Sequence, residues 1–162
     1  MLYLPFEDFL SANKGTFPAI LLLPVVHEIP ERMLSPGPST QGYVARAVDY
    51  EDGQFIGIFN AAVGMDPFKK LAFESLASLR SQACVDPHRM GVICYSLGGF
   101  FEIYLVPNEN GFKAGVIYYG MYDVPDLIKN LKVPILAFQG DADHMTEFIR
   151  NAAADETDRH GL

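Results

Sequence analysis

The stretch RMGVICYSLGGFF, from Arg89 to Phe101, contains the clearest change from strand to helix in the sequence. Its first half is a short run of apolar residues, which is typical of one buried β-strand. The run stops at Ser96, and two glycines follow before apolar residues resume. A chain that turns from a strand into a helix over so few residues needs small neighbours, because the two elements pack closely at the turn. Cys94 and Gly98, two positions on either side of the serine, meet this requirement.

Apolar runs alternate with helix-like segments along the rest of the chain. The run PAILLLPVV, from Pro18 to Val26, is continuously apolar, as expected of a parallel strand covered on both faces. Further strands are expected at residues 43–50, 90–96, 114–120 and 133–140, and helices at residues 66–79, 98–106, 124–131 and 146–161. This alternation predicts an α/β fold: a mostly parallel β-sheet with helices on both faces, in a single domain over residues 1–162.

Composition narrows the classes of partner and cofactor. The 162 residues carry a formal net charge of −8 without a basic cluster, which argues against nucleic acid and anionic membranes as partners. Two cysteines and four scattered histidines form neither a disulfide framework nor a metal-binding pattern. With no secretory signal and no apolar run of transmembrane length, we expect a cytoplasmic protein that needs no metal or organic cofactor. The oligomeric state stays open.

The polar residues that could take part in catalysis directly follow the expected strands. In parallel sheets, catalytic and binding residues usually lie at the carboxyl ends of the strands. Ser96 follows such a strand in a Cys-x-Ser-x-Gly pattern, a variant of the G-x-S-x-G nucleophile elbow. At an elbow the serine hydroxyl is lifted above the sheet, beside a helix N-terminus that favours negative charge. A simpler alternative is that Ser96 only caps the helix beginning at Gly98.

Several segments in order resemble the dienelactone hydrolase family, a branch of the α/β-hydrolases. The segment VDPHRMGVICYSLGG is similar to that family's approach to its nucleophile turn, and ILLLPVVHEIP is similar to its first core strand, which ends in His-Glu-Ile. QGYVARAVDY resembles its second strand, VIYYG a later strand, and VPILAFQGDADH the strand that leads into its acid loop. The resemblance runs from about residue 17 to residue 144 and implies an α/β-hydrolase-like, three-layer fold.

The resemblance also implies roles for individual residues. Ser96 lies where the family has its nucleophile, which is a cysteine in the founding enzymes, and Asp143 lies where it has its triad acid. The backbone N–H groups of Ile29 and Leu97 fall at the oxyanion hole. Glu28 matches a family glutamate that contacts the nucleophile. Cys94 is expected to be a small packing residue.

The catalytic base is harder to place. In α/β-hydrolases the chain order is serine, acid, histidine. His160 satisfies that order, but it lies at the expected end of the tail helix, whereas the family histidine follows a further helix and strand. His144 is next to the acid and is read as structural, and Asp123 is a second candidate for the acid because it also follows a strand. The family's carboxylate-binding arginines have no counterpart in this sequence.

The sequence is therefore compatible with two functions. The first is a serine hydrolase of small carboxylic esters or lactones, acting through an acyl-enzyme, in a compact or C-terminally incomplete member of the family. The second is a hydrolase-like scaffold without turnover, which the missing base motivates. The partner expected for the first is a small-molecule ester or lactone.

Overall fold

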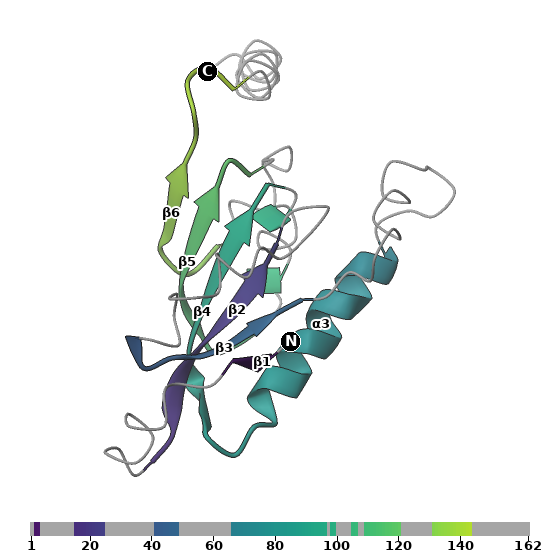
Figure 1. Ribbon diagram of the computed structural model, residues 1–162, viewed down its shortest axis with the longest axis vertical. Helices are drawn as coiled ribbons and strands as arrows, with labels where there is room; N and C mark the ends of the chain where they lie inside the picture. The colour runs from purple at the N-terminus through teal and green to yellow at the C-terminus, as the bar shows by residue number, and fades with distance from the viewer. Residues whose placement is uncertain are drawn as a thin grey trace.

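A computed structural model of the protein describes residues 2–3, 15–24, 41–48, 66–96, 98–99, 105–106, 109–120 and 131–143. Within these residues the chain forms a six-stranded β-sheet. The strands are β1 (Leu2–Tyr3), β2 (Phe17–Leu23), β3 (Val44–Ala47), β4 (Val85–Tyr95), β5 (Phe112–Tyr118) and β6 (Ile135–Phe138), and they lie in the order β1-β3-β2-β4-β5-β6. Strands β2 to β6 are mutually parallel and only β1 is antiparallel (Figure 1). The predicted α/β class and mostly parallel sheet are confirmed.

The observed strands differ from the expected ones mainly at their ends. β1 was not expected, because two residues are too few to give a strand pattern. β4 begins at Val85 rather than at Met90, because Val85 pairs with Phe17 at the start of β2. Between these pairs the register shifts, and residues 87–89 are exposed. Pro18 lies at this irregularity, which is where a strand tolerates a residue without an N–H group.

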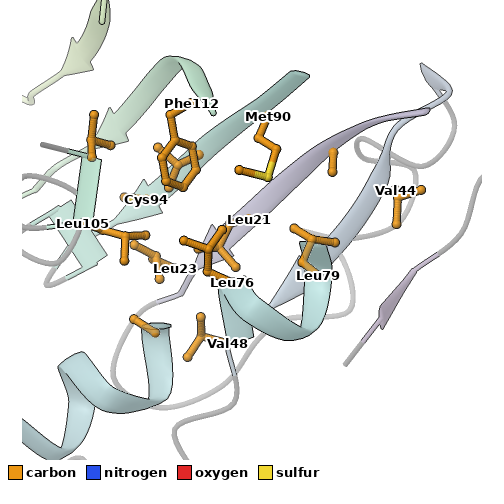
Figure 2. Close-up of a cluster of buried hydrophobic side chains, with 14 of the residues drawn as sticks. Leu21, Leu23, Val44, Val48, Leu76, Leu79, Met90, Cys94, Leu105 and Phe112 are labelled. Atoms are coloured by element: carbon orange, nitrogen blue, oxygen red, sulfur yellow. The ribbon is translucent and has the colours of Figure 1, made fainter. Parts of the chain in front are cut away.

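Helix α3 (Asp66–Arg80) covers one face of the sheet and packs against β2, β3 and β4. Its apolar residues recur at helical spacing, and Ala72, Leu76 and Leu79 are buried as the sequence predicts. They meet Leu21, Leu23, Met90 and Cys94 from the sheet, among other apolar side chains (Figure 2). Cys94 is fully buried in this cluster, so its expected packing role is confirmed.

A second, smaller cluster lies among the strands β2, β3 and β4. It consists of Leu22, Ala45 and Ala47, with Ile20 and Ile93 packed against them. These residues alternate along their strands with members of the first cluster, so they point to the face of the sheet opposite α3. Both faces of the central strands are thus apolar, as the continuous run in β2 predicts.

Among the residues that the structure describes, none forms a helix with the length and apolar composition of a membrane span. Within the same ranges, no group of three or more histidine, cysteine, aspartate or glutamate side chains is arranged to hold a metal ion.

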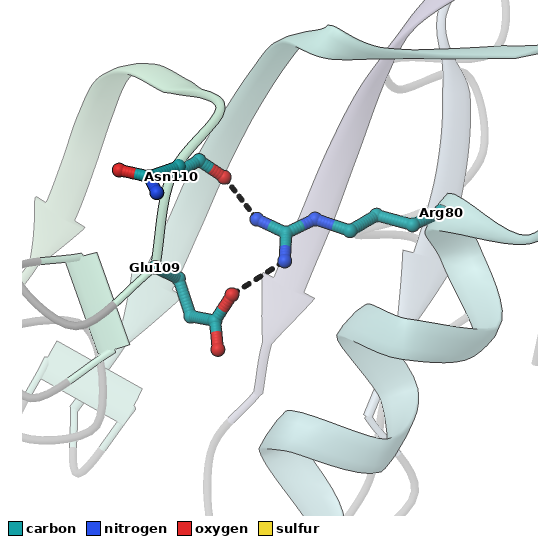
Figure 3. A network of polar contacts seen from close by, with 3 residues as sticks. All are labelled: Arg80, Glu109 and Asn110. Carbon is teal, nitrogen blue, oxygen red and sulfur yellow. Dashed lines mark hydrogen bonds and ion pairs between the residues drawn. The ribbon is translucent and has the colours of Figure 1, made fainter.

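Arg80, in the last turn of α3, joins that helix to the turn before β5 (Figure 3). One guanidinium nitrogen donates to the carboxylate of Glu109 and the other to the backbone carbonyl of Asn110. The Arg80 and Glu109 side chains are each 26% exposed, so this ion pair is better shielded from water than an ordinary surface pair.

Replacing Arg80 with alanine is expected to destabilise the fold by about 1 kcal/mol, because a two-pronged contact between distant segments is lost. For a chain of this length the melting temperature would fall by roughly 2–4 °C. Lys70→Ala is the matched control, since the Lys70–Glu74 pair is 75% and 59% exposed and spans one helical turn. Equal melting temperatures for the two variants, measured by circular dichroism, would contradict this reading.

Candidate active site

Ser96 is the first residue after β4, and its backbone has a φ of +52°, in the left-handed region. Residues without a glycine's freedom adopt this conformation rarely, and when they do the cost is on the order of 1–3 kcal/mol. Two backbone hydrogen bonds fix the turn: the Ser96 N–H donates to the Tyr118 carbonyl at 2.9 Å, and the Gly99 N–H donates to the Ser96 carbonyl at 2.9 Å. Residues 98 and 99 are already helical. The expected sharp turn from strand to helix is therefore observed.

The glycines around this turn are required by close packing. A Cβ atom at Gly98 would lie 2.3 Å from the backbone carbonyl oxygen of Leu23, at the end of β2. A Cβ at Gly99 would lie 3.0 Å from the Cα of Gly120, and one at Gly120 would lie 3.5 Å from the Ser96 carbonyl oxygen. The serine turn is thus held between the ends of two neighbouring strands, β2 and β5.

Asp143 lies just beyond the carboxyl end of β6 and is half-buried. Its N–H donates to the Gly140 carbonyl at 3.1 Å, which closes a turn after the strand. One of its carboxylate oxygens, Oδ2, accepts a hydrogen bond of 3.0 Å from the side-chain amide of Gln139. The carboxylate is therefore held by a neighbouring side chain.

The sheet brings Ser96 and Asp143 to the same edge. Tyr95 is in register with Tyr118 on β5, and Tyr118 is in register with Phe138 on β6. Since the three strands are parallel, both residues follow carboxyl ends at the same edge of the sheet, with the end of β5 between them (Figure 1). β4 and β6 are separated by one strand, which places their ends roughly 10 Å apart.

His88 is the one histidine that the described ranges contain, and it lies at the opposite end of β4. It is exposed, and its backbone N–H donates to the Asp86 carboxylate at 2.9 Å. Because eight residues of extended chain separate it from Ser96, the two are roughly 25 Å apart. This position is too far from Ser96 for proton transfer.

Several residues singled out from the sequence lie outside the described residues. They are Glu28, Ile29, Leu97, Asp123, His144 and His160. Their assignments remain predictions.

An aromatic row borders the serine turn and was not identified from the sequence. Tyr95 and Tyr118 stack with ring centroids 5.2 Å apart, and Tyr118 and Phe138 stack at 4.9 Å. Burial, followed by the neighbouring Tyr118 and Tyr119, raises the pKa of Tyr95 above 10.0, so its hydroxyl stays protonated at neutral pH. Tyr95 is therefore unsuited to act as a base for its neighbour Ser96.

Gln139 was also missed from the sequence. Its position at the end of β6 gives no signal, because its role depends on a side-chain contact four residues further along. The apolar strand followed by a Gly-x-x-Asp turn indicates only the carboxylate.

Comparison with known protein families agrees with the resemblance seen in the sequence. The sequence matches the dienelactone hydrolase family over residues 42–159, a range that includes Ser96 and Asp143 but excludes Glu28, Ile29 and His160. The sequence matches none of the curated proteins with which it was compared.

Solved structures agree in fold. A protein named m3DLH superposes with a TM-score of 0.72 at 19% identity, over 99% of this chain and 71% of its own. A dienelactone hydrolase-like promiscuous phosphotriesterase, P91, from metagenomic libraries superposes with a TM-score of 0.70 at 17% identity, over 94% of this chain and 69% of its own. These likenesses support the α/β-hydrolase-like fold predicted from the sequence. The family match covers most of the sequence, and the chain belongs to the dienelactone hydrolase family.

Proposed function

We propose that this protein is a serine hydrolase of small carboxylic esters or lactones. The observation that carries the proposal is the left-handed backbone of Ser96 directly after β4, in a turn where Gly98 packs against Leu23 and Gly120 lies beside the Ser96 carbonyl. Strained backbone of this kind is concentrated at functional sites, where the surrounding packing maintains it. A serine that only capped the following helix would adopt an extended, unstrained conformation.

The proposed reaction has two halves. The Ser96 hydroxyl oxygen attacks the ester carbonyl carbon, its proton passes to a histidine, and that proton then goes to the departing alcohol as the C–O bond breaks. Water subsequently cleaves the acyl-enzyme by the same route and releases the acid. For a lactone, the alcohol and the acid remain parts of one molecule.

Each remaining group has a place in this scheme. Asp143 would orient the histidine and stabilise its charged form, since the gap of roughly 10 Å between the ends of β4 and β6 leaves room for an imidazole. His160 is the candidate base by chain order. The backbone N–H groups of Leu97 and Ile29 would stabilise the oxyanion, and one such donor is typically worth about 3 kcal/mol. The elbow packs against Leu23, shortly before Ile29 in the chain.

Hydrolysis of p-nitrophenyl acetate, followed by release of p-nitrophenolate, tests the proposal against the scaffold without turnover. Turnover that is lost in Ser96→Ala supports the hydrolase. A rate that is the same in both proteins and in heat-denatured controls favours the scaffold. The similarity to a protein described as a promiscuous phosphotriesterase makes paraoxon a useful second substrate in the same assay.

Gln139 is proposed as a positioning residue for Asp143, because it donates to the carboxylate that would hold the histidine. Gln139→Leu removes the donor, and kcat is expected to fall about 10-fold with KM nearly unchanged, since small misplacements of catalytic groups act on the chemical step. Gln139→Glu should lower kcat further, because an ionised carboxylate cannot donate and repels Asp143. A fall in melting temperature without a change in kcat would assign Gln139 a purely structural role.

A further inference from the structure

Tyr119 lies beside the row of stacked aromatic rings next to Ser96 but is tilted out of the stack. Tyr95, Tyr118 and Phe138 occupy matched positions on β4, β5 and β6 and stack nearly parallel, with interplanar angles of 10° and 8°. Their neighbours Cys94 and Ile117 belong to the buried cluster beneath α3. The row therefore lies on the face of the sheet opposite α3, and it ends at the edge where the nucleophile turn begins.

Tyr119 does not continue the pleat of β5. Its φ is +42°, the second left-handed value at a non-glycine residue among those described, after Ser96. Its N–H donates to the Phe138 carbonyl at 2.7 Å, which fixes this backbone across the last step of the sheet. Its ring is tilted by 50° against the ring of Tyr95, with centroids 6.2 Å apart.

Tyr119 is also close to the nucleophile turn through its backbone. The next residue, Gly120, packs against Gly99 and lies beside the Ser96 carbonyl. Tyr95, which the Tyr119 ring approaches, directly precedes Ser96. The two strained residues thus belong to adjoining turns that contact each other through glycines.

Tyr119 remains 42% exposed despite its fixed backbone. An aromatic ring that serves only the core would be buried, and a turn that needs a left-handed residue would more often use glycine or asparagine. Strain and exposure together leave an aromatic face in solvent at the turn that adjoins the Ser96 turn.

We propose that the exposed ring of Tyr119 binds the acyl part of the substrate and gives the enzyme a preference for esters of aromatic carboxylic acids. This inference rests on the proposed serine hydrolase function and specifies its substrate class. A planar aromatic acyl group stacks on or against the edge of the Tyr119 ring, whereas a saturated ring of similar size gains only area burial. Stacking of this kind corresponds to a selectivity of about 3- to 10-fold.

The test compares p-nitrophenyl benzoate with p-nitrophenyl cyclohexanecarboxylate, which share a leaving group and differ in planarity. Tyr119→Asn removes the ring but tolerates the left-handed backbone, and Tyr119→Phe keeps the ring. The ratio of kcat/KM for benzoate to that for cyclohexanecarboxylate should fall about 3- to 10-fold in Tyr119→Asn and stay unchanged in Tyr119→Phe. Comparing ratios between variants cancels the intrinsic reactivity of the two esters.

Phe138→Leu is the matched control, because it removes an exposed ring of the neighbouring stacked row, on the strand further from Ser96. Its ratio should equal that of the wild type. The inference is overturned if Tyr119→Asn leaves the ratio unchanged, or if Phe138→Leu lowers it as much.

A binding measurement separates this inference from the proposed function. Saturation-transfer NMR can compare methyl benzoate with methyl cyclohexanecarboxylate on Ser96→Ala and on Ser96→Ala combined with Tyr119→Asn. A preference for the benzoate that depends on Tyr119 supports the aryl site even if the wild type shows no turnover, a result that would reject the hydrolase alone. Absence of that preference overturns the aryl site whatever the turnover.

Discussion

Replacing Asp143 with asparagine is expected to lower kcat for p-nitrophenyl acetate on the order of 10⁴-fold, the loss typical when a triad aspartate can no longer hold its histidine in the correct tautomer. The fold should be little affected, because an asparagine oxygen at this position can still accept the hydrogen bond that Gln139 now donates to Asp143 at 3.0 Å. A melting temperature close to that of the wild type would show that the loss is chemical.

Asp123→Asn is the control for this experiment. Asp123 also follows a strand, and the sequence alone leaves it as the second candidate for the acid. The proposal expects Asp123→Asn to retain most of the activity. The opposite pattern, with a large loss in Asp123→Asn and a small one in Asp143→Asn, would move the acid to residue 123 and remove the proposed role of Gln139.

Gly98→Ala is expected to damage both stability and activity. The added Cβ would lie 2.3 Å from the Leu23 carbonyl oxygen, a backbone atom that cannot move away without shifting β2. Overpacking of this severity costs about 3 kcal/mol, the upper part of the usual range. The melting temperature would fall by roughly 6–12 °C. Displacing the turn by about 1 Å would lower kcat on the order of 10²-fold as well.

Gly91→Ala, in the strand β4 that precedes the serine turn, is the matched control. A Cβ there would meet the Ile20 Cδ1 atom at 2.9 Å, the far end of a flexible side chain that can rotate away. Its effect on stability should stay below about 1 kcal/mol. If scanning calorimetry gave Gly98→Ala and Gly91→Ala similar melting temperatures, the close packing of the serine turn against β2 would not be a requirement of this fold.

The sequence predicts the central strands well because their signal is local. β2, β4 and β5 are runs of apolar residues, and side chains of β2 and β4 take part in hydrophobic clusters on both faces of the sheet. Strand ends are less predictable, since they depend on pairing between distant segments. Val85 joins β4 only because Phe17 lies beside it, and β1 exists only by pairing with β3.

In the candidate site too, features with a local sequence signal can be predicted, and features that depend on contacts between distant segments cannot. The position of Ser96 can be predicted because a sharp turn needs small residues at fixed offsets from the serine, and Gly98 is one of them. The roles of Gln139 and Tyr119 depend on contacts across turns and between strands, to Asp143 and to Tyr95, for which one sequence carries no pattern. Contacts of that kind become visible only once the strands are in register.

The central claim is that the turn at Ser96 presents an activated hydroxyl, and a fluorophosphonate probe tests it most directly. The folded protein is incubated with the probe, and the modified residue is identified by peptide mass spectrometry. We predict one label per chain, attached to Ser96, and no label in Asp143→Asn on the same timescale or in urea-unfolded protein. A folded wild type that stays unlabelled, or that is labelled equally before and after unfolding, would contradict the account.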